Sequence, residues 1–581
     1  MRLGVAQIDT RAGDLAHTVK RVVAYARTAS ERGCELLMFG LTTLSGPTGL
    51  PYVAQASFRL DCIEALRTVS AELACPCLMP IVSIIDDVGP AVEVLLVDGQ
   101  GVRSVGDGGG IDVRALDGAL PSEDKRHLTC SMAGQRLRFC FAYGDLDELG
   151  EARDAGGYDV VVFLSGYGYA VNDPSSALGS ALSEGRYPLD ARAAGTWLVG
   201  VGSVGGYGGQ IFAGSSFVLS PQGRPLAVAA AFEEDLIVAD VGTATAALEE
   251  NGESLAVEPY DEPLHLWQAL ALGLADYVQK TDRRGAVFVY DGTLGACALA
   301  ALASDALGPT QVRMLLAPGL DQERQATAES LGRALRLTVE AAPTGATAYA
   351  VAAQLLELGD GEDYVVLSAK DKTALALEAV SPWDRMAELM PLGDVYRIDI
   401  LGLMHARNAI TPLLPKVALH RDDLLDFGIA YDERIPEMYL GDIDFVLEHH
   451  HEGERTFGQL IEETGTDLTA VIEATRDAYA RCASRRRLRA TCLMASTCTI
   501  GEAALPVGFG WHDAGTVPLP ELEPELGGEE PRDVSREVSA SLRTAAVPDA
   551  AIEGMLRETL DLLRDISVGS GTDWKNPFSE N

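Results

Sequence analysis

Few side chains in this sequence combine the residue type and the spacing that catalysis or metal binding requires. Cys140 is a potential nucleophile, but it lies inside the apolar run LRFCFAY, which favours packing within a strand. The histidine run 449–451 could bind a metal, but adjacent helical residues point in different directions, which favours ordinary surface positions. The arginine run 485–487 is expected to hold an acidic patch of the same chain. The ten cysteines are scattered without a CxxC pair, so no zinc site is expected.

The net charge is the strongest signal in the composition. The 581 residues have a formal net charge of −39 at pH 7, which disfavours nucleic acids and anionic membranes as partners. With 47% hydrophobic and 23% charged residues, the chain has ample material for packed domains. No apolar run approaches the roughly 20 residues of a membrane span. The opening MRLGVAQIDT lacks a signal-peptide pattern, so a cytoplasmic location is expected.

Residues 1–242 alternate between segments typical of strands and of helices. Apolar runs such as LGVAQID, ELLMFG and VVVFLSG predict strands, some of them buried on both faces. The run HTVKRVVAYARTASERG predicts a helix that ends at Gly33, and SPQGRPL predicts a hairpin turn at Gly223. The following segment, 243–262, is rich in small and acidic residues, which suits a linker between domains.

Residues 263–515 form a second predicted domain. A helix, LHLWQALALGLADYVQK, precedes the strand AVFVY, a glycine-containing turn and the alanine-rich helix ACALAALASDAL. Further strands and helices alternate after it, which predicts a parallel sheet covered on both faces. Residues 516–581 comprise a Pro- and Glu-rich segment and one amphipathic helix with Leu556, Leu563 and Ile566 on a shared stripe.

These segments together resemble the glutamine-dependent NAD+ synthetase family. AQIDTRAGDLAHTVKRVVAYARTASERGCELLMFG and VGSVGGYGGQIFAGSSFVLSPQGRPL resemble a nitrilase-type amidase domain. The strand–turn–helix from AVFVY through DALG, and PLGDVYR at 391–397, resemble an ATP-pyrophosphatase-type amide synthetase. The resemblance implies an α/β protein: an α-β-β-α nitrilase-like sandwich followed by a parallel-sheet, adenine-nucleotide-hydrolase-like domain. It also implies a parent reaction in which ATP, Mg and glutamine-derived ammonia amidate deamido-NAD+.

The resemblance places unreactive residues at the three positions of the amidase chemistry. Members of the family use a glutamate base, a lysine and a cysteine nucleophile in their first domain. Here the base position carries Leu41, the lysine position falls on Val113, and the nucleophile position falls on Tyr143. Cys140 lies three residues too early. Because covalent glutamine hydrolysis needs a thiolate and a base together, no catalytic residue is expected in this domain.

The family's pyrophosphate loop, Ser-Gly-Gly-x-Asp-Ser, is also altered. The matching residues run from Asp291 through Gly292 and Thr293 to Gly295, followed by an alanine. One glycine is retained, but Gly295 occupies the position of the metal-binding aspartate. Asp291 adds a carboxylate where phosphate would approach, and like charges repel.

The family's second nucleotide motif, Ser-Thr-Gly-Asn-Lys-Ser-Glu, is retained only in part. The motif keeps its first hydroxyl at Ser368, its ammonium at Lys372 and its second hydroxyl at Thr373. The acid that ends the motif in the family is replaced here by Ala374. Lys372 could still contact a phosphate, or it could equally be a solvated lysine. With both acids of the parent site missing, neither ATP nor Mg nor a resident metal is expected to bind.

Three functional hypotheses remain open. In the first, the chain is a pseudoenzyme that acts as a scaffold, a regulator or an assembly partner of an intact paralogous synthetase. In the second, it is an active NAD+ synthetase that works through other residues, such as Cys140 and Lys372. In the third, it is a repurposed enzyme or ligand-binding module that uses the old nucleotide cleft for another molecule. A new pocket shaped by the glycine-rich stretch 202–210 would favour this third hypothesis. The family resemblance and the C-terminal stripe also predict a homo-oligomer.

Overall fold

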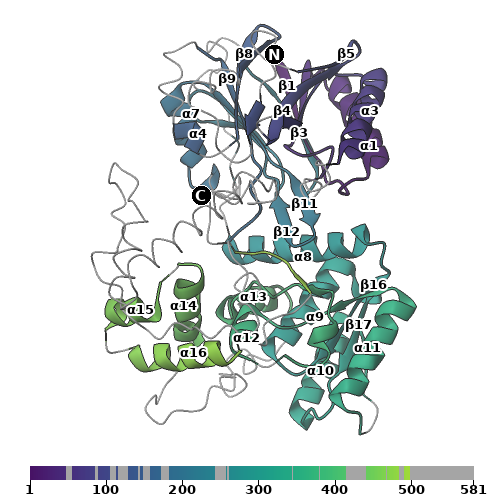
Figure 1. Ribbon diagram of the computed structural model, residues 1–581, viewed down its shortest axis with the longest axis vertical. Coiled ribbons are helices and arrows are strands. Elements are labelled where there is room, and N and C mark those ends of the chain that lie inside the picture. Colours follow the sequence, from purple (N-terminus) through teal and green to yellow (C-terminus); the bar gives the residue numbers. More distant parts are fainter. Residues whose placement is uncertain are drawn as a thin grey trace, which may run out of the picture.

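The chain folds into two domains, one above the other in the view of Figure 1. This computed structural model describes residues 1–46, 55–85, 89–104, 113–115, 129–141, 144–147, 157–171, 182–242, 255, 257, 261–342, 345–378, 380–413, 440–453, 455–465, 468–482 and 490–496. Three segments with predictions from the sequence lie outside these residues: most of the linker 243–262, the arginine run 485–487 and the C-terminal segment 516–581.

Two sheets form the middle of the first domain. The first has the strand order β15 (Asp235–Asp240), β1 (Arg2–Gln7), β2 (Leu36–Phe39), β3 (Cys77–Ile85), β4 (Gly89–Asp98) and β5 (Gly101–Ser104), with β6 (Val113–Ala115) also paired to β4. The second has the order β14 (Pro225–Val228), β13 (Phe217–Leu219), β10 (Trp197–Val201), β9 (Val160–Leu164), β8 (Gln135–Cys140) and β7 (Thr129–Met132). The three apolar runs singled out as strands form β1, β2 and β9.

The two sheets stack face to face with helices on their outer faces. One buried cluster joins residues of β1 and β2 to residues of β8 and β9, and therefore lies between the sheets. A second cluster packs the first sheet against α1 (Leu15–Glu31) and α3 (Ala56–Glu72). A third packs the second sheet against α4 (Gly144–Asp147) and α7 (Arg186–Ala194). The predicted α-β-β-α sandwich is confirmed (Figure 1).

Local sequence explains where α1 begins and where the chain reverses after it. The Asp14 side chain accepts a hydrogen bond from the backbone N–H of His17 and so caps the N-terminus of the helix. Gly33, just beyond the C-terminus, has a φ of +76°, in the left-handed region that glycine favours. Gly223, between the antiparallel strands β13 and β14, has a φ of +69°. The predicted helix end and the predicted hairpin turn are therefore confirmed.

The second domain is a parallel sheet with helices on both faces. Its strand order is β18 (Thr338–Glu340), β17 (Val312–Leu316), β16 (Gly285–Tyr290), β19 (Tyr364–Leu367), β20 (Leu389–Met390) and β21 (Thr491–Cys492). Helices α8 (Glu262–Lys280), α9 (Leu294–Leu307) and α10 (Gln322–Leu335) share a buried cluster with one face of the sheet. The other face packs against α11 (Ala348–Glu362). The predicted parallel α/β domain is confirmed.

Further helices complete the second domain. They are α12 (Lys372–Leu377), α13 (Arg397–Ile410), α14 (Leu440–His451), α15 (Phe457–Thr464) and α16 (Thr469–Cys482). Helices α12, α14 and α16 share a buried cluster with β20, so they are packed onto the domain rather than detached from it.

A glycine-rich hairpin docks the first domain onto the second. It consists of β11 (Val204–Tyr207) and β12 (Gln210–Ala213), and it rests on α8 (Figure 1). A Cβ atom at Gly206 would lie 2.9 Å from the Cα of Gly273, so the two backbones approach as only glycines allow. The stretch 202–210, which one hypothesis assigned to a new pocket, thus provides a contact surface between the domains.

Charged groups complete this junction. The carboxylate of Asp276 on α8 accepts a hydrogen bond from the backbone N–H of Gly206 at 2.5 Å. Lys280 forms an ion pair with Asp9 of the first domain at 2.5 Å and donates to the carbonyl oxygen of Gly206. Burial and the nearby Asp276 carboxylate raise the pKa of Asp9 to about 6, although Lys280 opposes that shift.

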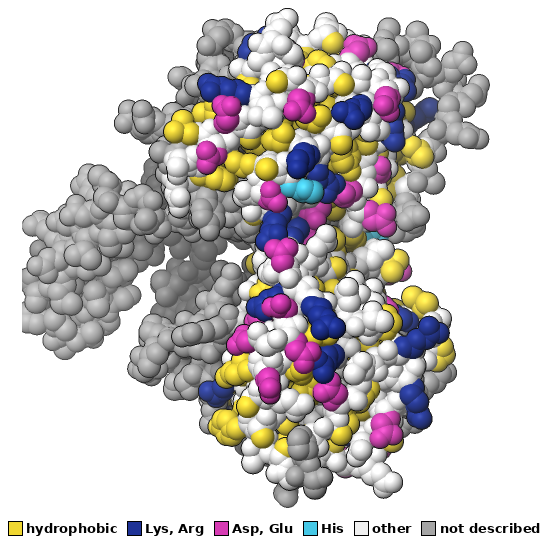
Figure 2. All heavy atoms as spheres, turned by 90° about the vertical axis from the view of Figure 1, so that its right-hand side faces the viewer, with side chains coloured by type: hydrophobic (Ala, Val, Ile, Leu, Met, Phe, Trp, Pro, Cys, Tyr) yellow, Lys and Arg dark blue, Asp and Glu magenta, His cyan; other side chains and the backbone are white. Residues whose placement is uncertain are grey.

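Basic and acidic side chains are interspersed over both domains on the face that Figure 2 shows. That face therefore has no extended surface of a single charge sign. None of the helices in the described part of the chain has the length and apolar character that crossing a membrane would require.

Candidate functional site

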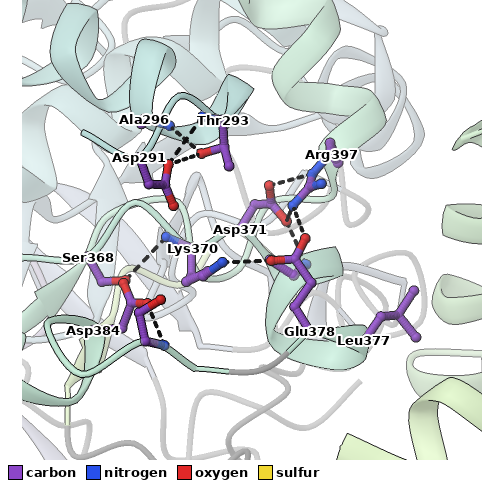
Figure 3. A network of polar contacts seen from close by, with 12 residues as sticks. Asp291, Thr293, Ala296, Ser368, Lys370, Asp371, Leu377, Glu378, Asp384 and Arg397 are labelled. Atoms are coloured by element: carbon purple, nitrogen blue, oxygen red, sulfur yellow. Dashed lines mark hydrogen bonds and ion pairs between the residues drawn. The ribbon is translucent and has the colours of Figure 1, made fainter. Parts of the chain in front are cut away.

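The candidate site lies where the strand order of the second domain reverses. β17 and β18 lie on one side of β16, and β19, β20 and β21 lie on the other. In doubly wound sheets, ligands bind beyond the carboxyl ends of the strands at this point. The loops that follow β16 and β19 contain the two motifs singled out from the sequence. Figure 3 shows side chains of both loops close together, beside Glu378 and Arg397.

The loop after β16 satisfies its own polar groups. The carboxylate of Asp291 accepts hydrogen bonds from the N–H and the hydroxyl of Thr293, at 3.1 and 2.6 Å. Between them, Gly292 has a φ of +85°, which requires the conformational freedom of glycine. The Thr293 hydroxyl in turn accepts from the backbone N–H of Ala296 and caps α9. The donors that such a loop would offer to a phosphate are therefore partly occupied by its own side chains.

The two loops are in direct contact at Gly295. A Cβ atom at this position would overlap the carbonyl oxygen of Ala369, in the loop after β19. This Cβ atom and the carbonyl oxygen would lie much closer than the sum of their van der Waals radii. Only glycine therefore fits at position 295 without a shift of the backbone. The position at which the family carries a metal-binding aspartate has no room for a side chain in this structure.

The loop after β19 begins with two buried polar contacts. The Ser368 hydroxyl donates to the carboxylate of Asp384 at 2.7 Å. The ammonium of Lys370 donates to the carboxylate of Glu378 at 2.6 Å. Burial alone would lower the pKa of Lys370, but the carboxylates of Glu378, Asp291 and Asp384 raise it above its usual value.

A buried arginine ties this loop to α13. The guanidinium of Arg397 donates to Asp371 at 2.8 Å and to Glu378 at 3.0 Å. Asp371 also caps α12 by accepting from the N–H of Ala374 at 2.6 Å. Although burial opposes ionisation, Lys370 and Arg397 hold the pKa of Glu378 below its usual value, so this carboxylate stays charged.

Lys372 is the largest departure from the sequence prediction. Its side chain has 0% exposure, so the alternative of a solvated lysine is wrong. Its ammonium forms ion pairs with Asp394 at 2.8 Å and Glu452 at 2.9 Å, and it donates to the hydroxyl of Ser496 at 2.7 Å. The second alternative was that Lys372 contacts a phosphate. In the structure its ammonium instead binds carboxylates of the same chain, because a buried ammonium must be neutralised.

Thr373 is also engaged within the protein. Its hydroxyl donates to Asp444 of α14 at 2.6 Å and accepts from the N–H of Arg397 at 2.9 Å. The second oxygen of Asp444 accepts from the N–H of Ile398 at 2.8 Å. Burial raises the pKa of Asp444 to about 7, since these hydrogen bonds only partly offset the lost hydration.

The residues at the strand ends do not fit a magnesium–triphosphate complex. Such a complex needs an acid that holds the metal, together with hydroxyls, N–H groups and a cation that face the phosphates. Gly295 and Ala374 supply no acid, and the lysine of the motif is engaged in ion pairs inside the protein. The arrangement is an internally paired network of charges, and what it can do directly is hold the surrounding loops and helices together.

The structure describes two of the three positions that the resemblance assigns to the amidase chemistry, and Cys140 as well. Leu41 follows β2, and its side chain is 2% exposed in the core between the two sheets. Val113 lies in β6 opposite Glu93 of β4, and Tyr143 lies outside the described residues. Cys140 ends β8 with 0% exposure and packs between the second sheet and its helices, as expected for a packing residue.

The histidine run ends α14. No cluster of three or more potential metal ligands occurs among the described residues, which include this run. The three histidines are half-buried, and the ring of His450 stacks on Phe457 with centroids 4.0 Å apart. The three histidines thus keep partial exposure, as expected for surface positions, while the ring of His450 also packs against α15.

Sequence reasoning missed the ion-pair network itself. The family resemblance assigns no role to Lys370, Glu378 or Arg397, and each looks like an ordinary surface charge when read one residue at a time. A possible signal was the position of Lys370 shortly after a strand buried at every residue, where an unpaired charge would be costly.

The architecture matches that of known proteins, although no protein-family model matches the chain. The glutamine-dependent NAD(+) synthetase of Rhodobacter capsulatus is 24% identical over 453 residues, which are 70% of this chain and 78% of that protein. The enzyme of the same name from Synechocystis sp. is 35% identical over 121 residues, which are only 21% of its own length.

Solved structures agree with these sequence relatives. The glutamine-dependent NAD+ synthetase of Acinetobacter baumannii, in complex with ADP, has a TM-score of 0.59 and 18% identity, covering 87% of this chain and 99% of that chain. The enzyme from Cytophaga hutchinsonii has a TM-score of 0.65 and 12% identity, covering 89% and 98%. At such identities the likeness shows the fold alone. In sequence and in fold, this chain is a distant homologue of the glutamine-dependent NAD+ synthetases.

Proposed function

We propose that this chain is a non-catalytic homologue of glutamine-dependent NAD+ synthetase, a pseudoenzyme that acts as a scaffold or regulator. It would do so as a homo-oligomer or together with an intact paralogous synthetase. The observation that carries the proposal is the burial and ion pairing of Lys372. This lysine is the cation of the second nucleotide motif, and the sequence retains it. Its complete burial against Asp394 and Glu452 engages the ammonium inside the protein instead of on a ligand.

The electrostatics of the strand ends support the same proposal. A triphosphate would meet the carboxylate of Asp291 at the loop after β16, without a metal-binding acid at Gly295 to hold a screening cation. Lys370 and Arg397 are already neutralised by Glu378 and Asp371. Opening these pairs for a ligand would leave buried carboxylates uncompensated, which costs on the order of 3–5 kcal/mol per broken pair.

The first prediction concerns ATP. We expect no saturable binding of Mg-ATP below millimolar concentration by calorimetry, and no pyrophosphate release with deamido-NAD+ and ammonia. Charge-assisted hydrogen bonds contribute about 1.5–3 kcal/mol each, so the loss of several weakens binding by orders of magnitude. The Rhodobacter capsulatus enzyme serves as the positive control. Micromolar binding would refute the proposal, and binding without turnover would indicate a ligand sensor instead.

The second prediction concerns glutamine. The purified chain should release no ammonia from glutamine, because Leu41 is not a base and the Cys140 thiol is fully buried. An electrophilic glutamine analogue should likewise leave the intact mass of the protein unchanged. An adduct mapped to Cys140 by peptide mass spectrometry would show that this cysteine is reactive and that the domain retains a nucleophile.

The third prediction tests the contact between the two loops. Gly295→Ala should lower the free energy of unfolding by about 1–3 kcal/mol, because its Cβ would overlap the Ala369 carbonyl oxygen. Gly402→Ala is the matched control in α13, since a Cβ there meets nothing within 4 Å. That substitution should raise stability by about 0.5–1 kcal/mol. Urea unfolding of both variants measures the difference, and equal effects would contradict the close contact.

The fourth prediction concerns pH. Folded Asp444 has a pKa of about 7, above the ordinary value of 3.8, so between these values only the folded state keeps the proton. The free energy of unfolding contributed by Asp444 should therefore fall as pH rises from about 4 to 7, by up to about 1.4 kcal/mol per unit. Asp444→Asn should lack this slope. Urea unfolding of both proteins across that range measures it, and a difference independent of pH would contradict the assignment.

A further inference from the structure

Residues 491–496 connect the candidate site to the first domain. This linking segment begins as the edge strand β21, which pairs with β20 of the second domain. Its later residues leave the sheet and enter the junction between the domains. Leu493 and Ala495 are buried there in one cluster with Tyr169 and Ile211 of the first domain.

Hydrogen bonds hold the linking segment to the first domain at two adjacent residues. The N–H of Met494 donates to the carbonyl oxygen of Gly209, in the turn of the docking hairpin, at 2.7 Å. The carbonyl oxygen of Ala495 accepts from the N–H of Val171 at 2.7 Å. A Cβ at Gly209 would lie 2.5 Å from the carbonyl oxygen of Cys492, so the segment lies directly against the hairpin.

Ala495 and the next residue, Ser496, are held from the other side by the buried charges. The N–H groups of Ala495 and Ser496 both donate to the carboxylate of Asp394, at 2.8 and 2.7 Å. The Ser496 hydroxyl accepts from Lys372 and is placed to donate to Asp394 at 3.0 Å. Ala495 therefore contacts Asp394 through its N–H and the first domain through its carbonyl oxygen.

We infer that Lys372 and Asp394 are positioning residues that hold the linking segment in place and thereby fix the junction between the two domains. The ammonium of Lys372 is the centre of the arrangement, because it binds Asp394, Glu452 and Ser496 together. If the linking segment moved away, the buried ammonium of Lys372 would lose the Ser496 hydroxyl, and the buried carboxylate of Asp394 would lose the N–H groups of Ala495 and Ser496. Buried charges that lose hydrogen-bond partners are costly, so these contacts hold the segment in place.

The role of Lys372 at the junction goes beyond the proposed function and does not depend on the loss of catalysis. Lys372, the retained lysine of the nucleotide motif, holds Ser496 of the linking segment. The neighbouring residues Met494 and Ala495 bind Gly209 and Val171 of the first domain, so Lys372 helps to hold the two domains together. The linking segment thus supports the junction in addition to the hairpin on α8 and the ion pair of Lys280 with Asp9.

Two serines of the same site allow a matched test. Ser496→Ala removes the hydroxyl through which Lys372 contacts the linking segment, but leaves both ion pairs of Lys372 and the two backbone N–H contacts of Asp394 intact. Ser368→Ala is the control, because its buried hydroxyl also binds a buried aspartate, Asp384, and does not belong to the linking segment. Lys372→Met is the stronger variant. The readout is hydrogen–deuterium exchange of the full chain, followed at the amide of Val171.

Ser496→Ala should accelerate exchange at Val171 by about fivefold, the change expected when one hydrogen bond that restrains local opening is lost. Lys372→Met should accelerate it further if that variant folds. Ser368→Ala should leave it unchanged, and exchange within β10 should not change in any variant. Unchanged exchange at Val171 in Ser496→Ala, or equal acceleration in both serine variants, would overturn the inference.

Discussion

A lysine ammonium without access to water is the constraint on which the second domain depends. The hydration that Lys372 loses on burial must be replaced by groups of the chain, and here Asp394, Glu452 and Ser496 converge to replace it. These partners come from the loop after β20, from the C-terminal side of α14 and from the linking segment. One buried charge thus determines the relative position of elements that are distant in the sequence.

The contacts around this lysine adjoin a network formed by its neighbours. Arg397 joins Asp371 to Glu378, Lys370 joins Glu378 to the loop after β19, and Thr373 joins Asp444 to α13. Glu378, which faces two cations, has a lowered pKa, whereas Asp444, which relies mainly on neutral donors, has a raised one. The strand ends of a doubly wound sheet ordinarily receive a ligand. Here the protein's own side chains pair with one another at that place.

The junction between the domains follows a different physical rule, which is close approach of backbones. Gly206 lies on Gly273 of α8, and Gly209 lies against the carbonyl of Cys492. Side chains at these positions would separate the surfaces, and the hydrogen bonds that Met494 and Ala495 make to the first domain would be lost. The glycine-rich composition of the hairpin is therefore a requirement of packing.

The sequence by itself determined the architecture, because periodic apolar runs, helix-ending glycines and the alternation of strand with helix are local signals. The strands β1, β2 and β9, the helix end at Gly33 and the parallel second domain were all predicted from such patterns. The sequence also located the two loops of the candidate site and the absence of an acid at Gly295 and Ala374. Only the tertiary structure decided what the remaining charges do. Whether a side chain is buried depends on which distant elements surround it. The motif that contains Lys372 therefore could not predict the burial of this lysine, its pairing with Asp394 or the role of the linking segment.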